Sequence, residues 1–85
     1  MQVKTFSTEE LQAWLISKVS EELELNPEDI DIQEPFAGYG LNSMTAVSLS
    51  GDLESLLGMK LSATLAWDYP TIEALANHLV SLMSA

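Results

Sequence analysis

One serine of this sequence has neighbours that could support chemistry. Ser43 follows the glycine-containing segment 38–42 and precedes a stretch with the hydrophobic spacing of a helix. A phosphate attached to its hydroxyl would lie near backbone N–H groups and the positive end of the helix dipole. On these residues alone a structural interpretation is simpler: Ser43 caps the helix, the glycines allow a turn, and Leu41 and Met44 pack on the core.

Few other residues are of the types that enzymes use at their reaction centres. The sequence contains one histidine, His78, and neither cysteine nor arginine. Because His78 lies off the hydrophobic stripe of the last predicted helix, we expect it to be solvated. A serine–histidine–aspartate triad would need Ser43 and His78 in an enclosed cleft, for which 85 residues leave little room. The acidic run at 28–34 lacks the ligand spacing of a calcium loop. The sequence therefore predicts neither an enzyme nor a metal site.

The elements that must position Ser43 are helices. Hydrophobic spacing predicts helices over residues 7–24, 43–57 and 71–83, and one further helical turn around residues 63–67. No pair of strands is predicted. The expected fold class is all-α, a small four-helix bundle of three main helices and one short helix. We expect residues 1–85 to form a single domain.

The predicted helix boundaries depend on local capping signals. Ser7 and Glu10 fit a capping box at the start of the first helix. Asn42 or Ser43 can cap the second helix, and Gly58 is well placed to end it. These signals fix the start of the second helix within one residue of Ser43.

The second helix and the connection before it have unusual compositions. The helix contains Gly51 and several residues of low helix propensity, so either packing stabilises it or small residues let another molecule approach closely. The connection over residues 26–42 is longer than most loops of compact domains. Its hydrophobic residues are expected to hold it on the core, and they are Ile30, Ile32, Phe36 and Leu41.

Charge limits the partners of this protein. The formal net charge is −10, and the stretch from Val19 to Met59 contains nine acidic residues but no lysine or arginine. Such a surface repels nucleic-acid phosphates and anionic membranes, which leaves a merely solubilising role or basic protein partners. No hydrophobic run approaches the ~20 residues of a membrane span, and a signal peptide is not evident. We expect a cytoplasmic monomer.

Two segments together carry a family resemblance. The first consists of Gly40, Leu41, Asn42, Ser43 and Met44, and the second runs Trp67–Ile72. They resemble, respectively, the glycine–aliphatic–Asp–Ser–aliphatic motif of acyl carrier proteins and a block typical of carriers from modular polyketide synthases. The resemblance covers most of the chain.

This resemblance implies a function for Ser43. It would be the attachment point of 4'-phosphopantetheine, which a phosphopantetheinyl transferase takes from coenzyme A. The thiol at the end of that arm would hold acyl or polyketide intermediates as thioesters, and the carrier would present them without catalysing a step. The implied partners are a loading enzyme (an acyltransferase or an acyl-adenylate ligase), a ketosynthase and other synthase domains.

The resemblance also implies a docking surface around the start of the second helix. Met44 and Val47 are candidate hydrophobic contacts, and complementary charge for basic partners comes from Glu34, Asp52 and Glu54. Asn42 stands where the family usually has Asp. Asn still caps a helix, but the negative charge that normally meets the transferase or its metal site is missing. Two alternatives stay open: a peptidyl carrier of non-ribosomal peptide synthesis, and a non-modified acidic helical adaptor.

Overall fold

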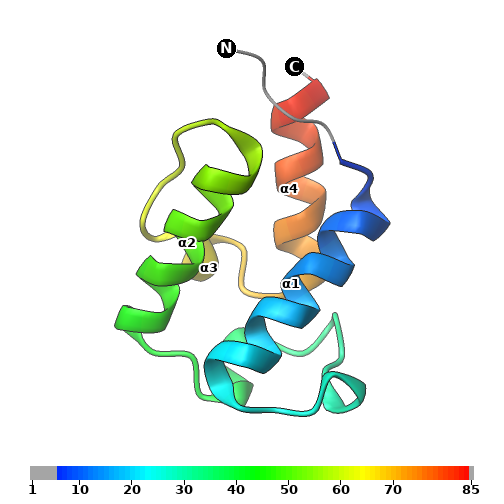
Figure 1. The fold of residues 1–85 in the computed structure, drawn as a ribbon, viewed down its shortest axis with the longest axis vertical. Coiled ribbons are helices and arrows are strands. Elements are labelled where there is room, and N and C mark those ends of the chain that lie inside the picture. The colour runs from blue at the N-terminus through cyan, green and yellow to red at the C-terminus, as the bar shows by residue number, and fades with distance from the viewer. Residues whose placement is uncertain (1–5, 85) are drawn as a thin grey trace.

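The structure, a computed structural model, describes residues 6–84, which form four α-helices (Figure 1). Their bounds are α1 (Thr8–Leu23), α2 (Ser43–Leu57), α3 (Leu65–Asp68) and α4 (Ile72–Ser84). Two 3-10 turns, η1 (Pro27–Asp29) and η2 (Phe36–Tyr39), lie between α1 and α2. The predicted all-α bundle is confirmed for this part of the chain. None of the helices described here is long and hydrophobic enough to cross a bilayer.

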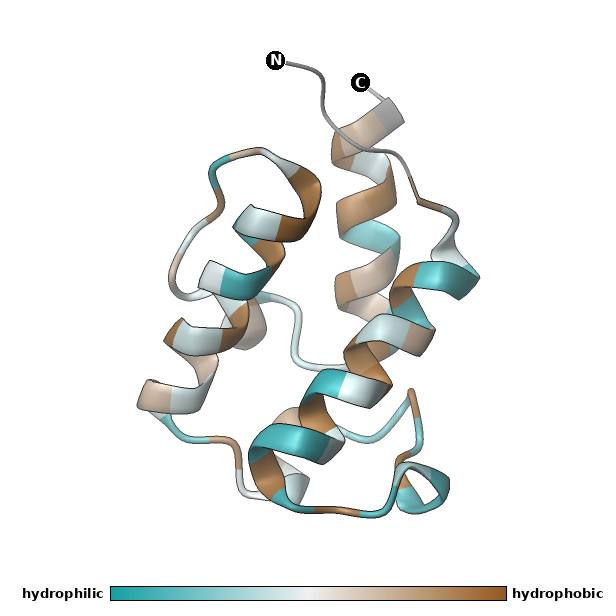
Figure 2. Cartoon of the chain, viewed as in Figure 1, coloured by the Kyte–Doolittle hydropathy of each residue, from teal (hydrophilic) through white to brown (hydrophobic). Residues whose placement is uncertain are grey.

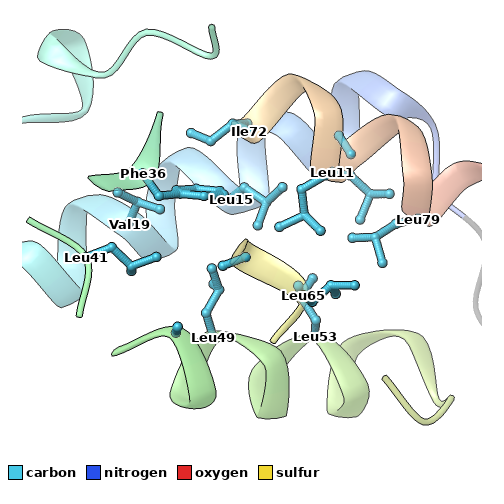
Figure 3. Close-up of a cluster of buried hydrophobic side chains, with 14 of the residues drawn as sticks. Leu11, Leu15, Val19, Phe36, Leu41, Leu49, Leu53, Leu65, Ile72 and Leu79 are labelled. Carbon is cyan, nitrogen blue, oxygen red and sulfur yellow. The ribbon is translucent and has the colours of Figure 1, made fainter. Parts of the chain in front are cut away.

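The hydrophobic core lies among all four helices. α1 packs along α4, and α3 packs against α2. Leu49 and Leu53 of α2 point toward Leu11 of α1 and Leu79 of α4, with Leu65 of α3 between them (Figure 3). All five side chains are buried, and each stabilises the fold by about 1.5–3 kcal/mol through removal of apolar surface from water. This packing is what holds α2, despite its weak helix formers.

Local caps set the ends of the long helices where the sequence predicts them. Ser7 and Glu10 form the expected capping box, with the Ser7 N–H donating to Glu10 Oε1 (2.8 Å) and the Glu10 N–H to Ser7 Oγ (3.1 Å). At the other end of α1, Glu24 closes the helix in the left-handed region at φ 56°. Gly58 ends α2 at φ 70°, where its N–H donates to the carbonyl of Glu54.

The connection between α1 and α2 is fastened to the beginning of α4. The Phe36 N–H donates to the Pro70 carbonyl (2.7 Å), and the Glu73 N–H donates to the Ile32 carbonyl (3.0 Å). Phe36 and Leu41 are buried, as the sequence predicts. Hydrophilic residues gather over the end of α1 and η1 (Figure 2). Both lie within the stretch from Val19 to Met59, which contains no lysine or arginine. The connection is therefore an ordered segment that leads directly to the start of α2.

The short helix predicted around residues 63–67 is confirmed as Leu65–Asp68. It begins two residues later than the sequence indicates, because Ser62 and Thr64 form a hydrogen-bonded turn before it (Thr64 N–H to Ser62 Oγ, 3.1 Å). One expectation about the C-terminal half is wrong. His78 is not a fully solvated histidine. Its half-buried ring stacks on Tyr69 with ring centroids 3.9 Å apart, because the segment after α3 brings that tyrosine onto α4.

Candidate functional site

Ser43 is the first residue of α2, and its side chain is exposed. The cap of the helix is its neighbour Asn42, whose Oδ1 accepts hydrogen bonds from the Thr45 N–H (2.9 Å) and the Thr45 hydroxyl (3.1 Å). The structural interpretation of Ser43 as the cap is therefore wrong. Within the described chain, no hydrogen bond occupies the Ser43 hydroxyl.

A tight turn delivers the chain to this serine. η2 ends at Gly40 with φ 89°, a conformation that favours glycine, and the Gly40 N–H donates to the carbonyls of Ala37 and Phe36. The next residue, Leu41, is buried, and its N–H donates to the Phe36 carbonyl (3.3 Å). A buried anchor and a helix cap thus stand immediately before Ser43 and fix its position at the edge of the fold.

The face of α2 beside Ser43 points away from the core and carries no charge. Met44 is 85% exposed and Val47 is 54% exposed, so the expectation that Met44 packs on the core is wrong. Met44 is two residues before Ala46, about 200° around the helix, so it lies opposite the side on which Ala46, Leu49 and Leu53 face the core. Gly51 lies on the same outer face, and a Cβ atom built on it would have no atom within 4 Å apart from the backbone of its own helix. Nothing in the described chain explains why that position is a glycine.

The three acidic residues expected to meet partners have partners or neighbours inside the fold. Asp52 forms an ion pair with Lys18 of α1 (Oδ2 to Nζ, 3.6 Å). Glu54 accepts a hydrogen bond from the Leu61 N–H (2.8 Å) and so holds the segment after α2. The side chain of Glu34 lies against Gly38, where it fills the space that a Cβ atom would need. Asp52 and Glu54 are residues of α2, and Glu34 belongs to the connection before it.

The chemistry available at this site is that of an unassisted hydroxyl. No hydrogen bond links Ser43 to an acid or to His78 in the part of the chain that the structure describes. Nor do the described residues contain a group of three or more acidic or histidine side chains placed to hold a metal ion. Among the described residues, Ser43 thus has an exposed hydroxyl without a hydrogen-bonded base beside it.

Comparison with known proteins identifies the family. Residues 13–79 match the family model described as the phosphopantetheine attachment site. The chain belongs to this family. Among solved structures, it is similar to a free-standing peptidyl carrier protein from Acinetobacter baumannii (45% identity, TM-score 0.87), with 91% of this chain and 96% of that chain covered. It is also similar to an acyl carrier protein from Anabaena with a variant phosphopantetheinylation-site sequence (42% identity, TM-score 0.82, 96% and 97% covered).

Polyketide synthases are among the curated relatives. The chain is 36% identical over 70 residues to a phenolphthiocerol/phthiocerol polyketide synthase of Mycobacterium tuberculosis, a match that covers 82% of this chain and 4% of that protein. It is 34% identical over 68 residues to polyketide synthase PksL of Bacillus subtilis, with 80% and 2% covered. The chain thus spans a small fraction of these proteins. It is a carrier domain of the phosphopantetheine-binding family, similar to those of polyketide synthases.

The group that this family carries covalently is 4'-phosphopantetheine. The described residues fit such a group, because an exposed, unpaired hydroxyl stands at the N-terminus of a long helix. Sequence patterns assign no role of its own to one residue near the site. Tyr39 lies between two glycines, and only the folded connection reveals that its hydroxyl bonds to the backbone of Asp31. A lone aromatic residue inside a glycine-containing turn was the only available signal.

Proposed function

We propose that this protein carries acyl or polyketide intermediates as thioesters on a 4'-phosphopantetheine arm attached to Ser43. The observation that supports this most is the exposed Ser43 hydroxyl, which forms no hydrogen bond with residues 6–84 and lies inside the segment that the family model matches. In the proposed modification the Ser43 oxygen attacks a phosphorus of coenzyme A, a phosphodiester bond forms, and adenosine 3',5'-bisphosphate leaves. The arm supplies the thiol, and because the chain has no cysteine, no protein thiol competes for the acyl group.

The helix favours the modified form of Ser43. The phosphodiester would lie beside the positive end of the α2 dipole and the free N–H groups of its first turn. The Asn42 side chain accepts from the Thr45 N–H, and the N–H groups of Ser43 and Met44, which precede the first carbonyl-bonded turn, have no partner within the helix. A surface charge at this position gains about 0.3–1 kcal/mol from the dipole.

The proposed partners follow from the same family. They are a phosphopantetheinyl transferase, a loading enzyme (an acyltransferase or an acyl-adenylate ligase), a ketosynthase and further synthase domains, supported by the polyketide synthases among the relatives. We propose that residues 1–85 work as one non-catalytic carrier domain in the cytoplasm, where coenzyme A is available.

We propose that partners dock on the outer face of α2. Met44 and Val47 form its exposed hydrophobic part. Glu34, Asp52 and Glu54 contribute negative charge around it, although the ion pair of Asp52 with Lys18 reduces its share. Hydrophobic contact at the centre and charge at the rim give the short-lived, moderately salt-sensitive binding that successive partners require.

Intact mass spectrometry tests the proposal. The protein is incubated with coenzyme A, Mg²⁺ and a phosphopantetheinyl transferase of broad specificity, beside Ser43→Ala and the control Ser48→Ala, which removes another exposed serine of α2. The wild type and Ser48→Ala should gain one phosphopantetheine, and Ser43→Ala should gain none. Asn42→Asp restores the usual family residue and should react faster. Failure of both wild type and Asn42→Asp to react would leave the non-modified adaptor as the better account.

A peptidyl carrier is the second candidate, supported by the likeness to the free-standing peptidyl carrier protein. The two candidates differ in what is loaded on the arm. The modified protein should accept a fatty acyl group from an acyl-adenylate ligase. Loading by an amino-acid-adenylating enzyme, with no loading by the ligase, would favour the peptidyl carrier.

A further inference from the structure

We propose that Tyr39 is a positioning residue whose hydroxyl holds the connection that presents Ser43 to the modifying transferase. This inference rests on the proposed attachment at Ser43. It concerns a residue that lies outside α2, in η2, and that acts through the backbone leading into α2.

The hydroxyl of Tyr39 forms two hydrogen bonds with the backbone of one residue. It accepts from the Asp31 N–H (2.6 Å) and donates to the Asp31 carbonyl (3.0 Å). The half-buried ring of Tyr39 packs against the core while its hydroxyl reaches across the turn. These two bonds close the segment from Asp31 to Tyr39 into a ring of backbone and side chain.

The Asp31 end of this ring is fixed to the rest of the fold. The Asp31 carbonyl also accepts from the Glu34 N–H (3.1 Å), and the Asp31 side chain accepts from the Gln33 N–H (2.9 Å). The adjacent Ile32 carbonyl accepts from the Glu73 N–H of α4 (3.0 Å). Asp31 is therefore a firm point to which Tyr39 attaches the end of η2.

The Tyr39 end leads to Ser43 through a short chain of contacts. Tyr39 is the last residue of η2, and Gly40 turns the backbone immediately after it. The Leu41 N–H bonds to the Phe36 carbonyl (3.3 Å), and Asn42 caps α2. Loss of the Tyr39 hydroxyl removes the tie between the C-terminal end of η2 and Asp31, while the buried Phe36 and Leu41 keep their places in the core. The fold survives, but the approach to Ser43 becomes less ordered.

If the segment that leads to Ser43 is less ordered, the transferase should bind more weakly. The enzyme must order the segment around Ser43 before the serine oxygen can meet the phosphorus, and a segment already held by the protein removes that cost. A hydrogen bond exposed to water contributes modestly, so the expected loss in kcat/KM is about two- to tenfold. We expect it mainly as a raised KM for the carrier, with kcat changed by less than about twofold.

The experiment compares two tyrosine-to-phenylalanine variants. Tyr39→Phe removes the two bonds to Asp31. Tyr69→Phe is the matched control, because the Tyr69 hydroxyl has no hydrogen-bond partner in the described chain and its ring can still stack on His78. Transferase kinetics with coenzyme A should give a raised KM for Tyr39→Phe and wild-type values for Tyr69→Phe. Equal kinetics in the two variants would overturn the proposal for Tyr39. If both variants were still fully modified, the proposed attachment at Ser43 would be unaffected.

A third variant separates positioning from stability. Ile30→Val removes one methylene from the same connection and leaves Tyr39 and Asp31 bonded. If Tyr39→Phe acts through position, amide exchange at Asp31 and Leu41 should accelerate in that variant, and Ile30→Val should keep the wild-type KM. A KM that rises equally in both variants would assign Tyr39 to stability alone and overturn the inference. No modification of any protein, wild type included, would instead refute the proposed function.

Discussion

Gly51→Ala should change stability and function in opposite directions. Gly51 is exposed in the middle of α2, its φ is not positive, and an added Cβ atom would meet no other atom within 4 Å. Because alanine favours a helix over glycine by about 0.8–1.0 kcal/mol, the substitution should raise the free energy of unfolding by about 1 kcal/mol. For a domain of this size that corresponds to a rise of about 4–8 °C in Tm.

The expected functional cost comes from the proposed docking face. Gly51 is eight residues after Ser43, or about 12 Å along the helix. An interface of about 800 Å² on each partner reaches about 16 Å from its centre, so an enzyme centred on Ser43 would cover Gly51. A methyl group there would hold such a partner away from α2. The poorer packing at the interface should cost about 1 kcal/mol of binding free energy. We therefore expect kcat/KM of the transferase to fall by about three- to tenfold.

Thermal unfolding and transferase kinetics on the same preparations test both parts. Ser55→Ala is the control, because Ser55 is exposed later in α2 and the substitution raises helix propensity without adding bulk. Ser55→Ala should be slightly stabilised and react normally. A lower Tm for Gly51→Ala would contradict the stability argument. A higher Tm with an unchanged reaction rate would refute close approach by the transferase.

Two further predictions concern the stability of α2, the helix that begins at Ser43. Asn42→Ala removes the acceptor for the Thr45 N–H and should lower the free energy of unfolding, measured by urea titration, by about 0.5–2 kcal/mol. An unchanged midpoint of the titration would show that the cap is dispensable. Leu53→Ala leaves a cavity in the shared core and should cost about 2–5 kcal/mol, a large part of the stability of so small a domain. A cost below about 1 kcal/mol for Leu53→Ala would mean that the core described here is not closely packed.

Sequence patterns predicted the parts of the fold that local interactions determine. The capping box of Ser7 and Glu10 and the terminating Gly58 act within a few residues of the helix ends, so their sequence signals were sufficient. The position of Ser43 at the start of α2 followed from the same kind of signal. Only the geometry of the turn shows that Asn42 is the cap and that no residue of the described chain bonds to the Ser43 hydroxyl.

Contacts between distant segments could not be predicted in this way. The pairing of Asp52 with Lys18 depends on how α2 lies against α1, and the stack of His78 on Tyr69 depends on the path of the chain after α3. Met44 illustrates a different difficulty. A hydrophobic residue in the first turn of a helix fits either the core or the surface, and only the orientation of α2 shows that it faces outward.

The central claim is that Ser43, and no other residue, receives the phosphopantetheine arm. The most direct measurement is fragment-ion mass spectrometry of the protein after reaction with coenzyme A and transferase, read across the serines of α2. We predict one phosphopantetheine per chain, located on Ser43, with Ser48, Ser50 and Ser55 unmodified. Modification of any of those three instead of Ser43, or an unmodified chain under conditions that modify a known carrier protein, would contradict the account.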